Sequence, residues 1–269
     1  MINLIPMAGR GQRFISEGYR VPKPFIPVMG RPMFLTATRS LPPATDTVFV
    51  CLAEHAQRYP VQEQIQRSLP QARVVMVSGQ TEGQACTCLA AEPILNKGDG
   101  LLIASCDYET VYDAKRYGEL FNDPRVDLII WTFRYRSLPM PNPVSFAYCR
   151  IANGRVIEVV EKRPISDRPW LDSVVVGSFT FRSTELFLRA ARAMIAKNIR
   201  VQGEFCVATS LNQLIEEGVR VVPFEVEQFI SFGSPEELRR FLYWEEYFSS
   251  LEGFDGRDGA GLIDCASLL

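Results

Sequence analysis

The stretch INLIPMAGRGQRF, residues 2–14, places a largely apolar run directly before a loop with two glycines and two arginines. A short aliphatic run is typical of a strand buried on both faces of a parallel sheet. In an open α/β sheet, ligands bind beyond the carboxyl ends of the strands, where this loop lies. Gly9 and Gly11 allow backbone N–H groups to approach a ligand, and Arg10 and Arg13 supply positive charge. The stretch therefore predicts a phosphate-binding loop, although a glycine turn with solvated arginines is the alternative for a lone G-x-G.

Similar short apolar runs recur along the first half and alternate with amphipathic segments. The predicted strands after the first are 47–53, 72–78, 100–106 and 127–133. The predicted helices are 32–41, 57–68, 84–96 and 113–122, the last with Asp113 as its N-cap. This alternation predicts an α/β fold with a Rossmann-like open, mostly parallel twisted sheet and helices on both faces.

The second half has a mixed pattern. Asn153-Gly154 predicts a β-hairpin turn, because both residues tolerate the positive φ of a type I′ turn. The further predicted elements are strands at 174–181 and 219–227 and helices at 184–197, 204–217 and 234–248, the last opening with Ser234 and Glu237 as a capping box.

The chain shows no internal repeat and no long linker. We therefore expect one domain over residues 1–250, made of the halves 1–140 and 141–250. Residues 251–269 are rich in glycine and aspartate and are expected to form a flexible tail.

Composition excludes several classes of protein. The 29 basic and 31 acidic residues give a net charge of -2, so no global field favours nucleic acid or an anionic membrane. Seven cysteines and a single histidine, without metal-ligand spacing, argue against a structural metal site. No signal peptide and no apolar segment of about 18 residues is present, which predicts a cytoplasmic protein.

The two common phosphate-loop motifs do not fit. Phe14 stands where G-x-G-x-x-G requires its third glycine, and no Walker A sequence is present. Lys23 follows shortly, between Pro22 and Pro24. The two prolines are expected to keep its backbone extended and out of helices, so that the lysine is aimed at a ligand.

PMAGRGQRF (6–14) followed by PKPFIPVMGRPM (22–33) resembles the amino-terminal signature of the sugar-phosphate nucleotidyltransferases. About ten positions match in two blocks at the family's spacing. The resemblance implies that Ala8, Gly9 and Gly11 bind the nucleotide. It also implies that Arg13 and Lys23 neutralise charge on its phosphates.

Two later segments resemble the same family. SGQTEGQACTCLAA (78–91) is similar to its base-recognition segment, which implies that Gln80 and Gly83 contact the nucleobase. LLIASCDY (101–108) is similar to the strand-end segment that holds a divalent cation, which implies that Asp107 binds Mg²⁺. The chemistry asks for such a residue, because Mg²⁺ takes one or two carboxylates together with water and phosphate oxygens. A helix cap or turn role is the alternative for Asp107.

The second half resembles the acceptor side of the family, which implies a nucleotide-binding half (1–140) and an acceptor-binding half (141–250). EVVEKRP (158–164) implies that Glu161 contacts the acceptor and Lys162 its phosphate, and VVVGSFTF (174–181) implies that Gly177 approaches the acceptor. A solvated pair on an edge strand is the alternative for Glu161 and Lys162.

One position departs from the family. Ser231 stands where many members carry a second metal-binding aspartate. Either Asp107 suffices as a metal ligand together with the substrate phosphates, or another acid contributes. Glu204, which is also expected to contact the acceptor, is the first candidate for that acid, ahead of Asp255 and Asp258.

The resemblance implies a Mg-dependent nucleotidyltransferase. The enzyme would move a nucleotidyl group from a nucleoside triphosphate, with CTP slightly favoured, to a phosphorylated sugar or small phosphate or phosphonate acceptor, and release pyrophosphate. The subgroup most similar to PMAG and GYRVPKPF makes precursors of surface polysaccharide and lipopolysaccharide. The implied partners are a triphosphate and a phosphorylated small-molecule acceptor, with neither nucleic acid nor membrane, and homo-oligomerisation stays open.

Two alternatives remain from the sequence. A metal-dependent glycosyltransferase could use Asp107 and Glu109 as a D-x-D-like motif, although it would not need GRGQR and PKP. A non-catalytic nucleotide-binding subunit is favoured by Ser231 but opposed by the joint presence of Arg13, Lys23, Asp107 and Lys162.

Overall fold

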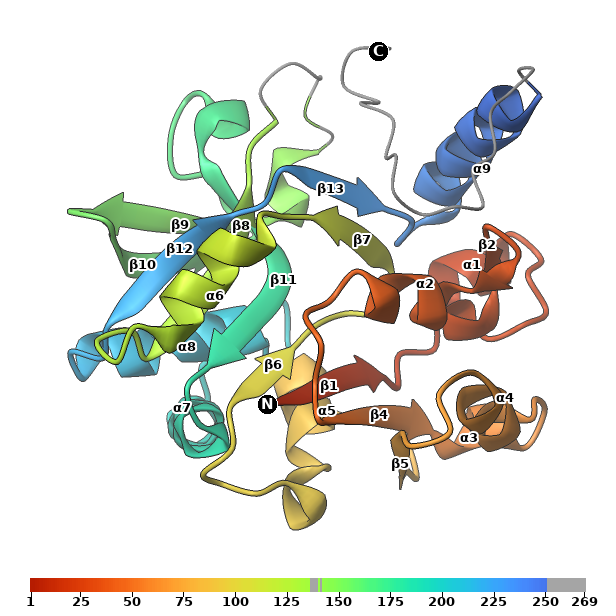
Figure 1. The fold of residues 1–269 in the computed structure, drawn as a ribbon, viewed down its shortest axis with the longest axis horizontal. Coiled ribbons are helices and arrows are strands. Elements are labelled where there is room, and N and C mark those ends of the chain that lie inside the picture. The colour runs from red at the N-terminus through yellow and green to blue at the C-terminus, as the bar shows by residue number, and fades with distance from the viewer. Residues whose placement is uncertain (136–139, 141, 251–269) are drawn as a thin grey trace.

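The computed structural model describes residues 1–135, 140 and 142–250, and its centre is one twisted sheet (Figure 1). The strands of this sheet from the first half are β1 (Ile2–Met7), β4 (Asp46–Leu52), β5 (Arg73–Val77), β6 (Leu101–Ile103) and β8 (Leu128–Phe133). Those from the second half are β9 (Ala147–Ala152), β10 (Arg155–Glu161), β11 (Ser173–Phe181) and β12 (Val221–Glu225). All five apolar runs predicted as strands in the first half are thus confirmed.

The sheet is parallel in its first part and mixed around β11. Strand β1 lies between β4 and β6, parallel to both, and β5 continues this parallel part beside β4. Strand β11 runs antiparallel to β6, β8 and β9, and the hairpin β9–β10 ends the sheet. Asn153 and Gly154 turn that hairpin with φ of 51° and 71°, as predicted. The predicted open α/β fold is confirmed.

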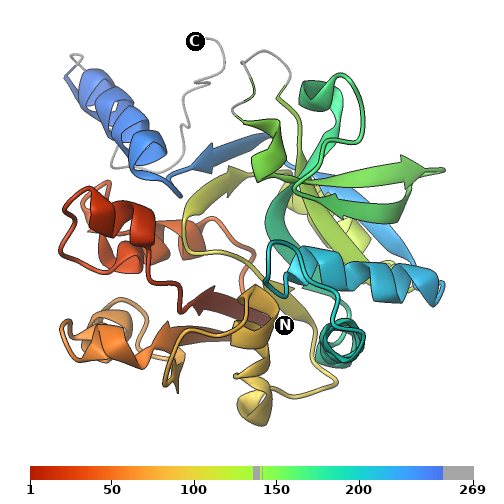
Figure 2. The ribbon, with the colours of Figure 1, turned by 180° about the vertical axis from the view of Figure 1, so that it is seen from behind.

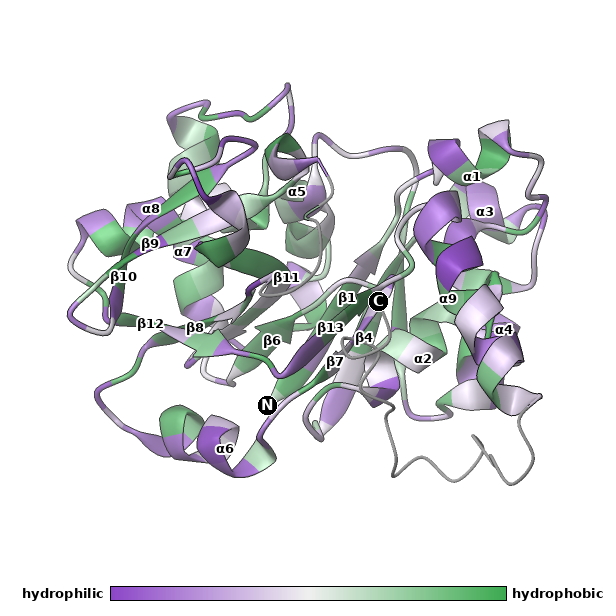
Figure 3. Ribbon diagram, turned by 90° about the horizontal axis from the view of Figure 1, so that it is seen from above, coloured by the Kyte–Doolittle hydropathy of each residue, from purple (hydrophilic) through white to green (hydrophobic). Residues whose placement is uncertain are grey.

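Helices cover both faces of the sheet. On one face pack α5 (Gln84–Leu89), α7 (Thr184–Ala196) and α8 (Val207–Glu216), seen in front in Figure 2. On the other face pack α2 (Met33–Arg39), α4 (Val61–Ser68) and α6 (Ala114–Asn122). Each face carries its own apolar core, and Figure 3 shows the hydrophobic strands enclosed between helices whose outer sides are hydrophilic. This burial is the main stabilising term of the fold.

The remaining elements lie near the ends of β1 and β6. They are α1 (Gln12–Ser16), the short pair β2 (Pro27–Val28) and β3 (Arg31–Pro32), the pair β7 (Tyr108–Val111) and β13 (Gln228–Ser231), and α9 (Pro235–Ser249). A small third core, which includes Phe14, Phe232 and Leu238, packs α9 against α1. The predicted cap of α9 is confirmed, because Ser234 Oγ accepts a hydrogen bond from the Glu237 N–H at 3.3 Å.

Several predicted helices are shorter than expected. The helix predicted at 57–68 is shortened to α4, which begins only after Pro60, and a separate short helix, α3 (Ala53–Ala56), precedes the predicted range. Pro60 has no N–H to donate within a helix, so it lies at the N-terminal boundary of α4. The helix predicted at 84–96 ends at Leu89, and Pro93 lies in a 3₁₀ turn, Glu92–Ile94. The helix predicted at 204–217 begins only at Val207.

Candidate functional site

The glycine loop leaves the carboxyl end of β1 and enters α1 through Gly11. Gly11 has φ 67° and ψ 38°, the left-handed conformation that glycine adopts at no steric cost. A Cβ at Gly11 would lie only 2.9 Å from Cβ of Lys23, so the position also requires the absence of a side chain. Phe14, 1% exposed, anchors the first turn of α1 in the small third core. The loop is therefore fixed against the segment that carries Lys23.

Lys23 begins a one-turn 3₁₀ helix, Lys23–Phe25, so the expectation that the two prolines keep it out of helical structure is wrong. Pro24 is tolerated because the first N–H groups of a helix have no partner within it. Pro22 does have an extended backbone, with φ -56° and ψ 139°. The Lys23 Nζ atom donates a hydrogen bond to Oδ2 of Asp107 at 2.5 Å and lies 5.6 Å from the centre of the Phe14 ring.

Asp107 lies in the turn between β6 and β7, at the same edge of the sheet as the glycine loop. Burial alone would raise the pKa of its carboxyl group. The charge and hydrogen bond of Lys23, helped by Ser105 and the charge of Arg13, outweigh that effect and bring the pKa below its ordinary value. Asp107 is therefore a carboxylate at neutral pH and faces two cationic side chains.

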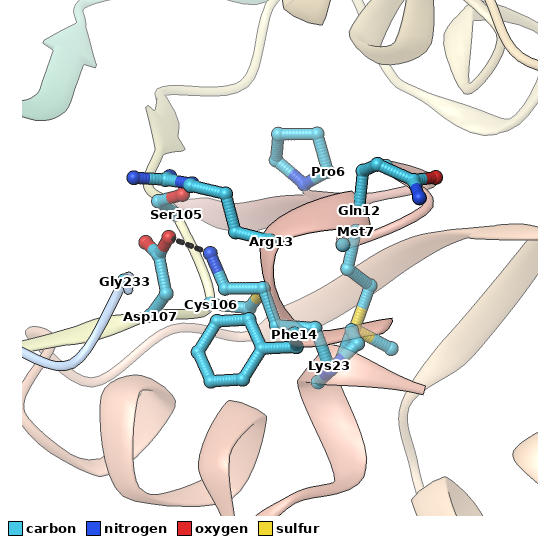
Figure 4. Close-up of a pocket in the computed structure, with 13 residues that line it drawn as sticks. Pro6, Met7, Gln12, Arg13, Phe14, Lys23, Ser105, Cys106, Asp107 and Gly233 are labelled. Carbon is cyan, nitrogen blue, oxygen red and sulfur yellow. Dashed lines mark hydrogen bonds and ion pairs between the residues drawn. The ribbon is translucent and has the colours of Figure 1, made fainter. Parts of the chain in front are cut away.

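Figure 4 shows these groups around one cavity of about 310 Å³. Arg13, Lys23 and Asp107 point toward one another across it, and Gly233 closes one side. The lining residues are Pro6, Met7, Gly9, Gly11, Gln12, Arg13, Phe14, Lys23, Pro24, Ser105, Cys106, Asp107 and Gly233. Burial and the nearby Asp107 charge raise the pKa of Cys106 to about 12, which keeps this thiol protonated and unsuited to nucleophilic attack.

The pairing of β7 with β13 brings the segment around Ser231 to Asp107. Ser231 is opposite Tyr108 in the register, and the Phe232 N–H donates to the Asp107 carbonyl at 3.0 Å. The hydroxyl of Ser231 accepts from the Gly233 N–H at 3.3 Å, so it closes a local turn. A Cβ at Gly233 would lie 3.0 Å from Oδ2 of Asp107. The sequence analysis missed Gly233, because no local signal reveals which strand pairs with β7.

The segment predicted to recognise a base is held by the loop before α8. Gly83 has φ 132°, and a Cβ there would lie 2.5 Å from the carbonyl oxygen of Phe205. Phe205 also donates its N–H to the Glu82 carbonyl at 2.7 Å and accepts from the Ala85 N–H at 3.0 Å. Gln80 is exposed at the start of this segment. Neither Gln80 nor Gly83 lines the cavity described above.

The predicted acceptor residues lie in the second half, outside that cavity. Glu161 accepts a hydrogen bond from the Thr209 hydroxyl at 2.7 Å, and Lys162, with φ 58°, donates from Nζ to the Ser145 carbonyl at 3.1 Å. Gly177 has φ 103°. Glu204 is exposed in a bridge with Val201. Asp255 and Asp258 lie outside the described residues.

Asp107 is the one acidic residue among the described residues that line this cavity, so it is the carboxylate that could bind a metal ion there. The described part of the chain holds no group of three histidine, cysteine, aspartate or glutamate side chains that could bind a metal by themselves. Asp107 fits Mg²⁺ with its remaining ligands drawn from water and substrate phosphates, which is the coordination that Mg²⁺ commonly has beside nucleotides. Within the described residues, no helix combines the length and apolar character needed to cross a membrane.

Comparison with known proteins shows which solved structures share the fold of this chain. No protein-family model and no curated protein matches the sequence. Solved structures do match. A nucleoside-diphosphate-sugar pyrophosphorylase from Vibrio cholerae RC9 superimposes with a TM-score of 0.74 at 23% identity, over 90% of this chain and 100% of that one. The chain has the nucleotidyltransferase fold.

Two further solved structures share this nucleotidyltransferase fold. The inositol-1-phosphate CTP transferase from T. maritima matches with a TM-score of 0.70 at 14% identity, over 93% of this chain and 97% of that one. The UTP-bound UGPase from Acinetobacter baumannii matches with a TM-score of 0.69 at 15% identity, over 94% of each chain. The resemblance drawn from the sequence is thus confirmed at the level of the fold.

Proposed function

We propose that the protein transfers a nucleotidyl group from a nucleoside triphosphate to a phosphorylated sugar or another small phosphate or phosphonate acceptor and releases pyrophosphate. The observation that carries the proposal is the convergence of Arg13, Lys23 and Asp107 on one cavity behind the glycine loop. Such transfer depends on positioning and charge stabilisation rather than on covalent chemistry by the protein. The names of the structural neighbours, a pyrophosphorylase, a CTP transferase and a UGPase, agree with this activity.

In the proposed reaction an oxygen of the acceptor phosphate or phosphonate forms a bond to the α-phosphorus. The bond from the α-phosphorus to the bridging oxygen breaks, and pyrophosphate leaves with the electron pair. Arg13 and Lys23 neutralise the charge that develops on the leaving group. Lys162 holds the acceptor phosphate in line, and Ala8, Gly9 and Gly11 supply the backbone around the triphosphate.

Asp107 is the proposed ligand of Mg²⁺, which would neutralise part of the charge of the substrate phosphates when bound. In the free protein Lys23 occupies Oδ2 of the same carboxylate. A Lys23→Met variant should therefore bind Mn²⁺ more tightly than the wild type when no nucleotide is present, as measured by electron paramagnetic resonance. Asp107→Asn should weaken Mn²⁺ binding, and unchanged binding in that variant would exclude Asp107 as a ligand.

The finer parts of the proposal concern the substrates. Gln80 and Gly83 contact the base, with CTP slightly favoured as donor, and Glu161, Gly177 and Glu204 contact the acceptor. Residues 1–250 act as one nucleotidyltransferase domain in the cytoplasm and supply precursors for polysaccharide synthesis. Homo-oligomerisation is compatible with this role.

The testing experiment is a titration of the purified protein with CTP, UTP, GTP, ATP and dTTP, each with Mg²⁺, beside UDP- and GDP-sugars. Pyrophosphate release is then measured with the selected triphosphate and a panel of sugar phosphates and phosphonates. Arg13→Ala and Lys23→Ala should each lower turnover by about 10²–10³-fold, as removal of a single preorganised donor does in other enzymes. Near-normal turnover in either variant contradicts the assigned role.

Asp107→Ala is the key variant, and Asp113→Ala is its control. Asp113 caps α6 by accepting from the Arg116 N–H at 3.0 Å, so its loss costs stability without reaching the cavity. Selective triphosphate binding that weakens only in Asp107→Ala supports the proposal. Binding of the nucleotide sugars alone would indicate a glycosyltransferase, and tight triphosphate binding without pyrophosphate release from any acceptor would indicate a regulatory subunit.

A further inference from the structure

Tyr108, the residue directly after Asp107, directs its hydroxyl group back to the turn that carries this carboxylate. It is the first residue of β7 and only 4% exposed. Its hydroxyl oxygen accepts a hydrogen bond from the Ser105 N–H at 3.3 Å. Ser105 and Asp107 both line the cavity, whereas Tyr108 does not. The hydrogen bond from Ser105 therefore ties the turn that carries Asp107 to a residue outside the cavity lining.

The same hydroxyl group reaches strand β11. It lies 2.6 Å from Oγ of Ser178, a side chain with no exposed surface. The pairing of β11 with β8 shifts register between Val175 and Phe179, so Ser178 belongs to a bulge. Bulges commonly re-aim a side chain beside a functional site. Here the bulge presents a serine hydroxyl to the tyrosine.

The aromatic ring of Tyr108 contacts the same bulge. A Cβ built at Gly177 would lie 3.5 Å from Cε1 of Tyr108, and the Phe229 ring packs on the tyrosine with ring centres 5.3 Å apart. Strand β11 also joins the two parts of the sheet, since it pairs with β6 and with β9. Tyr108 thus connects the Asp107 turn to the strand where the sheet changes from parallel to mixed.

We propose that Tyr108 is a positioning residue whose hydroxyl group fixes the Asp107 turn relative to the Gly177–Ser178 bulge. The inference rests on the proposed function, in which Asp107 serves the triphosphate and Gly177 serves the acceptor. The ring fills space in the core, and the hydroxyl group sets the distance between the two substrate sites. An error of about 1 Å in such an alignment costs on the order of a hundredfold in rate.

The alternative is that Tyr108 is only a core residue whose hydroxyl group needs a partner. Tyr117 provides the matched control for this alternative. It is similarly buried, at 6% exposed, and its hydroxyl group lies 3.4 Å from Oγ1 of Thr180 on the same strand β11. Tyr117 belongs to α6 and does not line the cavity. Tyr117→Phe therefore removes a buried hydroxyl group that faces the same strand, without touching the Asp107 turn.

The experiment compares Tyr108→Phe, Ser178→Ala, their double variant and Tyr117→Phe in kcat, KM for the acceptor and Kd for the triphosphate. We expect Tyr108→Phe to lower kcat by about 10- to 100-fold, with Kd for the triphosphate within about twofold of the wild type. Ser178→Ala should lower kcat in the same direction, and the double variant should lose little more than Tyr108→Phe, because the two hydroxyl groups act as a unit. Tyr117→Phe should retain the wild-type kcat.

A wild-type kcat in Tyr108→Phe, or an equal loss in Tyr117→Phe, overturns the positioning role while leaving the nucleotidyltransferase activity in place. An inactive wild type would instead contradict the proposed function. Hydrogen exchange then still tests the inference, because Tyr108→Phe should speed exchange at the amides of residues 105–107 and Tyr117→Phe should not. Unchanged hydrogen exchange at these amides in Tyr108→Phe excludes the positioning role of the Tyr108 hydroxyl group.

Discussion

The ammonium group of Lys23 and the carboxylate of Asp107 form an ion pair in the cavity, and their side chains are only 16% and 22% exposed. They come from segments 84 positions apart, the 3₁₀ turn after the glycine loop and the turn after β6. Both groups are therefore held ready, each neutralised by the other, before any substrate arrives. This arrangement has consequences for stability as well as for binding.

Breaking the pair from one side should destabilise the fold. Lys23→Met leaves the partly buried Asp107 carboxylate without its main partner. Asp107→Asn likewise leaves the partly buried Lys23 ammonium group without a charged partner at this site. We expect each single variant to lose about 1–3 kcal/mol of unfolding free energy. The double variant should lose less than the sum of the two, as measured by urea unfolding. Additive losses would mean that the pair contributes no coupling energy.

The pKa of Asp107 gives the pH dependence of this contribution. Because the pKa is lowered in the folded protein, the stabilisation is fully present above the ordinary value of 3.8 and is lost as the pH falls through the folded pKa. The difference in unfolding free energy between the wild type and Asp107→Asn should thus be constant from pH 7 to about pH 5 and should shrink below pH 3.8. A gap that widens in acid would contradict the direction of the shift.

Gly11 and Gly30 allow steric contact to be separated from backbone strain. Their φ values are 67° and 69°, so an alanine costs about 1–2 kcal/mol of strain at either position. Only at Gly11 does the new Cβ meet an atom, Cβ of Lys23 at 2.9 Å, whereas Gly30 has nothing within 4 Å. We expect Gly11→Ala to weaken triphosphate binding by about tenfold or more and Gly30→Ala to leave it unchanged. Calorimetric titration measures the Kd for the triphosphate in both variants. An equal Kd in Gly11→Ala and Gly30→Ala would show that Lys23 shifts to relieve the contact without harm to binding.

Features set by residues that are close in the sequence could be predicted. The glycine loop and Asp107 each follow an apolar run predicted as a strand of a parallel sheet, and they meet at one edge of the sheet because β6 lies beside β1. The hairpin at Asn153-Gly154 follows from the φ requirement of a two-residue turn. Such features depend on a few neighbouring residues and therefore leave a readable pattern.

Features that depend on distant contacts were missed. Strands β7 and β13 are four residues each and pair across more than a hundred positions, so no periodicity reveals that Gly233 reaches Asp107. The bulge at Gly177–Ser178 arises from how β11 meets β8, which the sequence of β11 alone does not show. The roles of Gln80, Glu161, Lys162 and Glu204 in substrate binding stay predictions.

Gly83 offers the most severe steric test in the segment predicted to recognise the base. An alanine Cβ would lie 2.5 Å and 2.6 Å from the carbonyl oxygen and the nitrogen of Phe205. These are backbone atoms, already hydrogen-bonded to Glu82 and Ala85, and cannot rotate away as a side chain would. We expect Gly83→Ala to lose about 3 kcal/mol or more, at the upper end of single substitutions, which corresponds to a fall in Tm of about 6–12 °C for a chain of this size.

Gly203 is the control for this prediction, because it lies in the same loop with φ 85° and has nothing within 4 Å of an added Cβ. Gly203→Ala should lose only the cost of the left-handed backbone, about 1–2 kcal/mol. If the displaced Phe205 loop carries Gln80 and Gly83 with it, Gly83→Ala should also weaken binding of every nucleoside triphosphate, while Gly203→Ala should not. A Gly83→Ala protein with the Tm of Gly203→Ala would show that residues 80–85 and the Phe205 loop move apart freely. The segment predicted to recognise the base would then not be held in a fixed position.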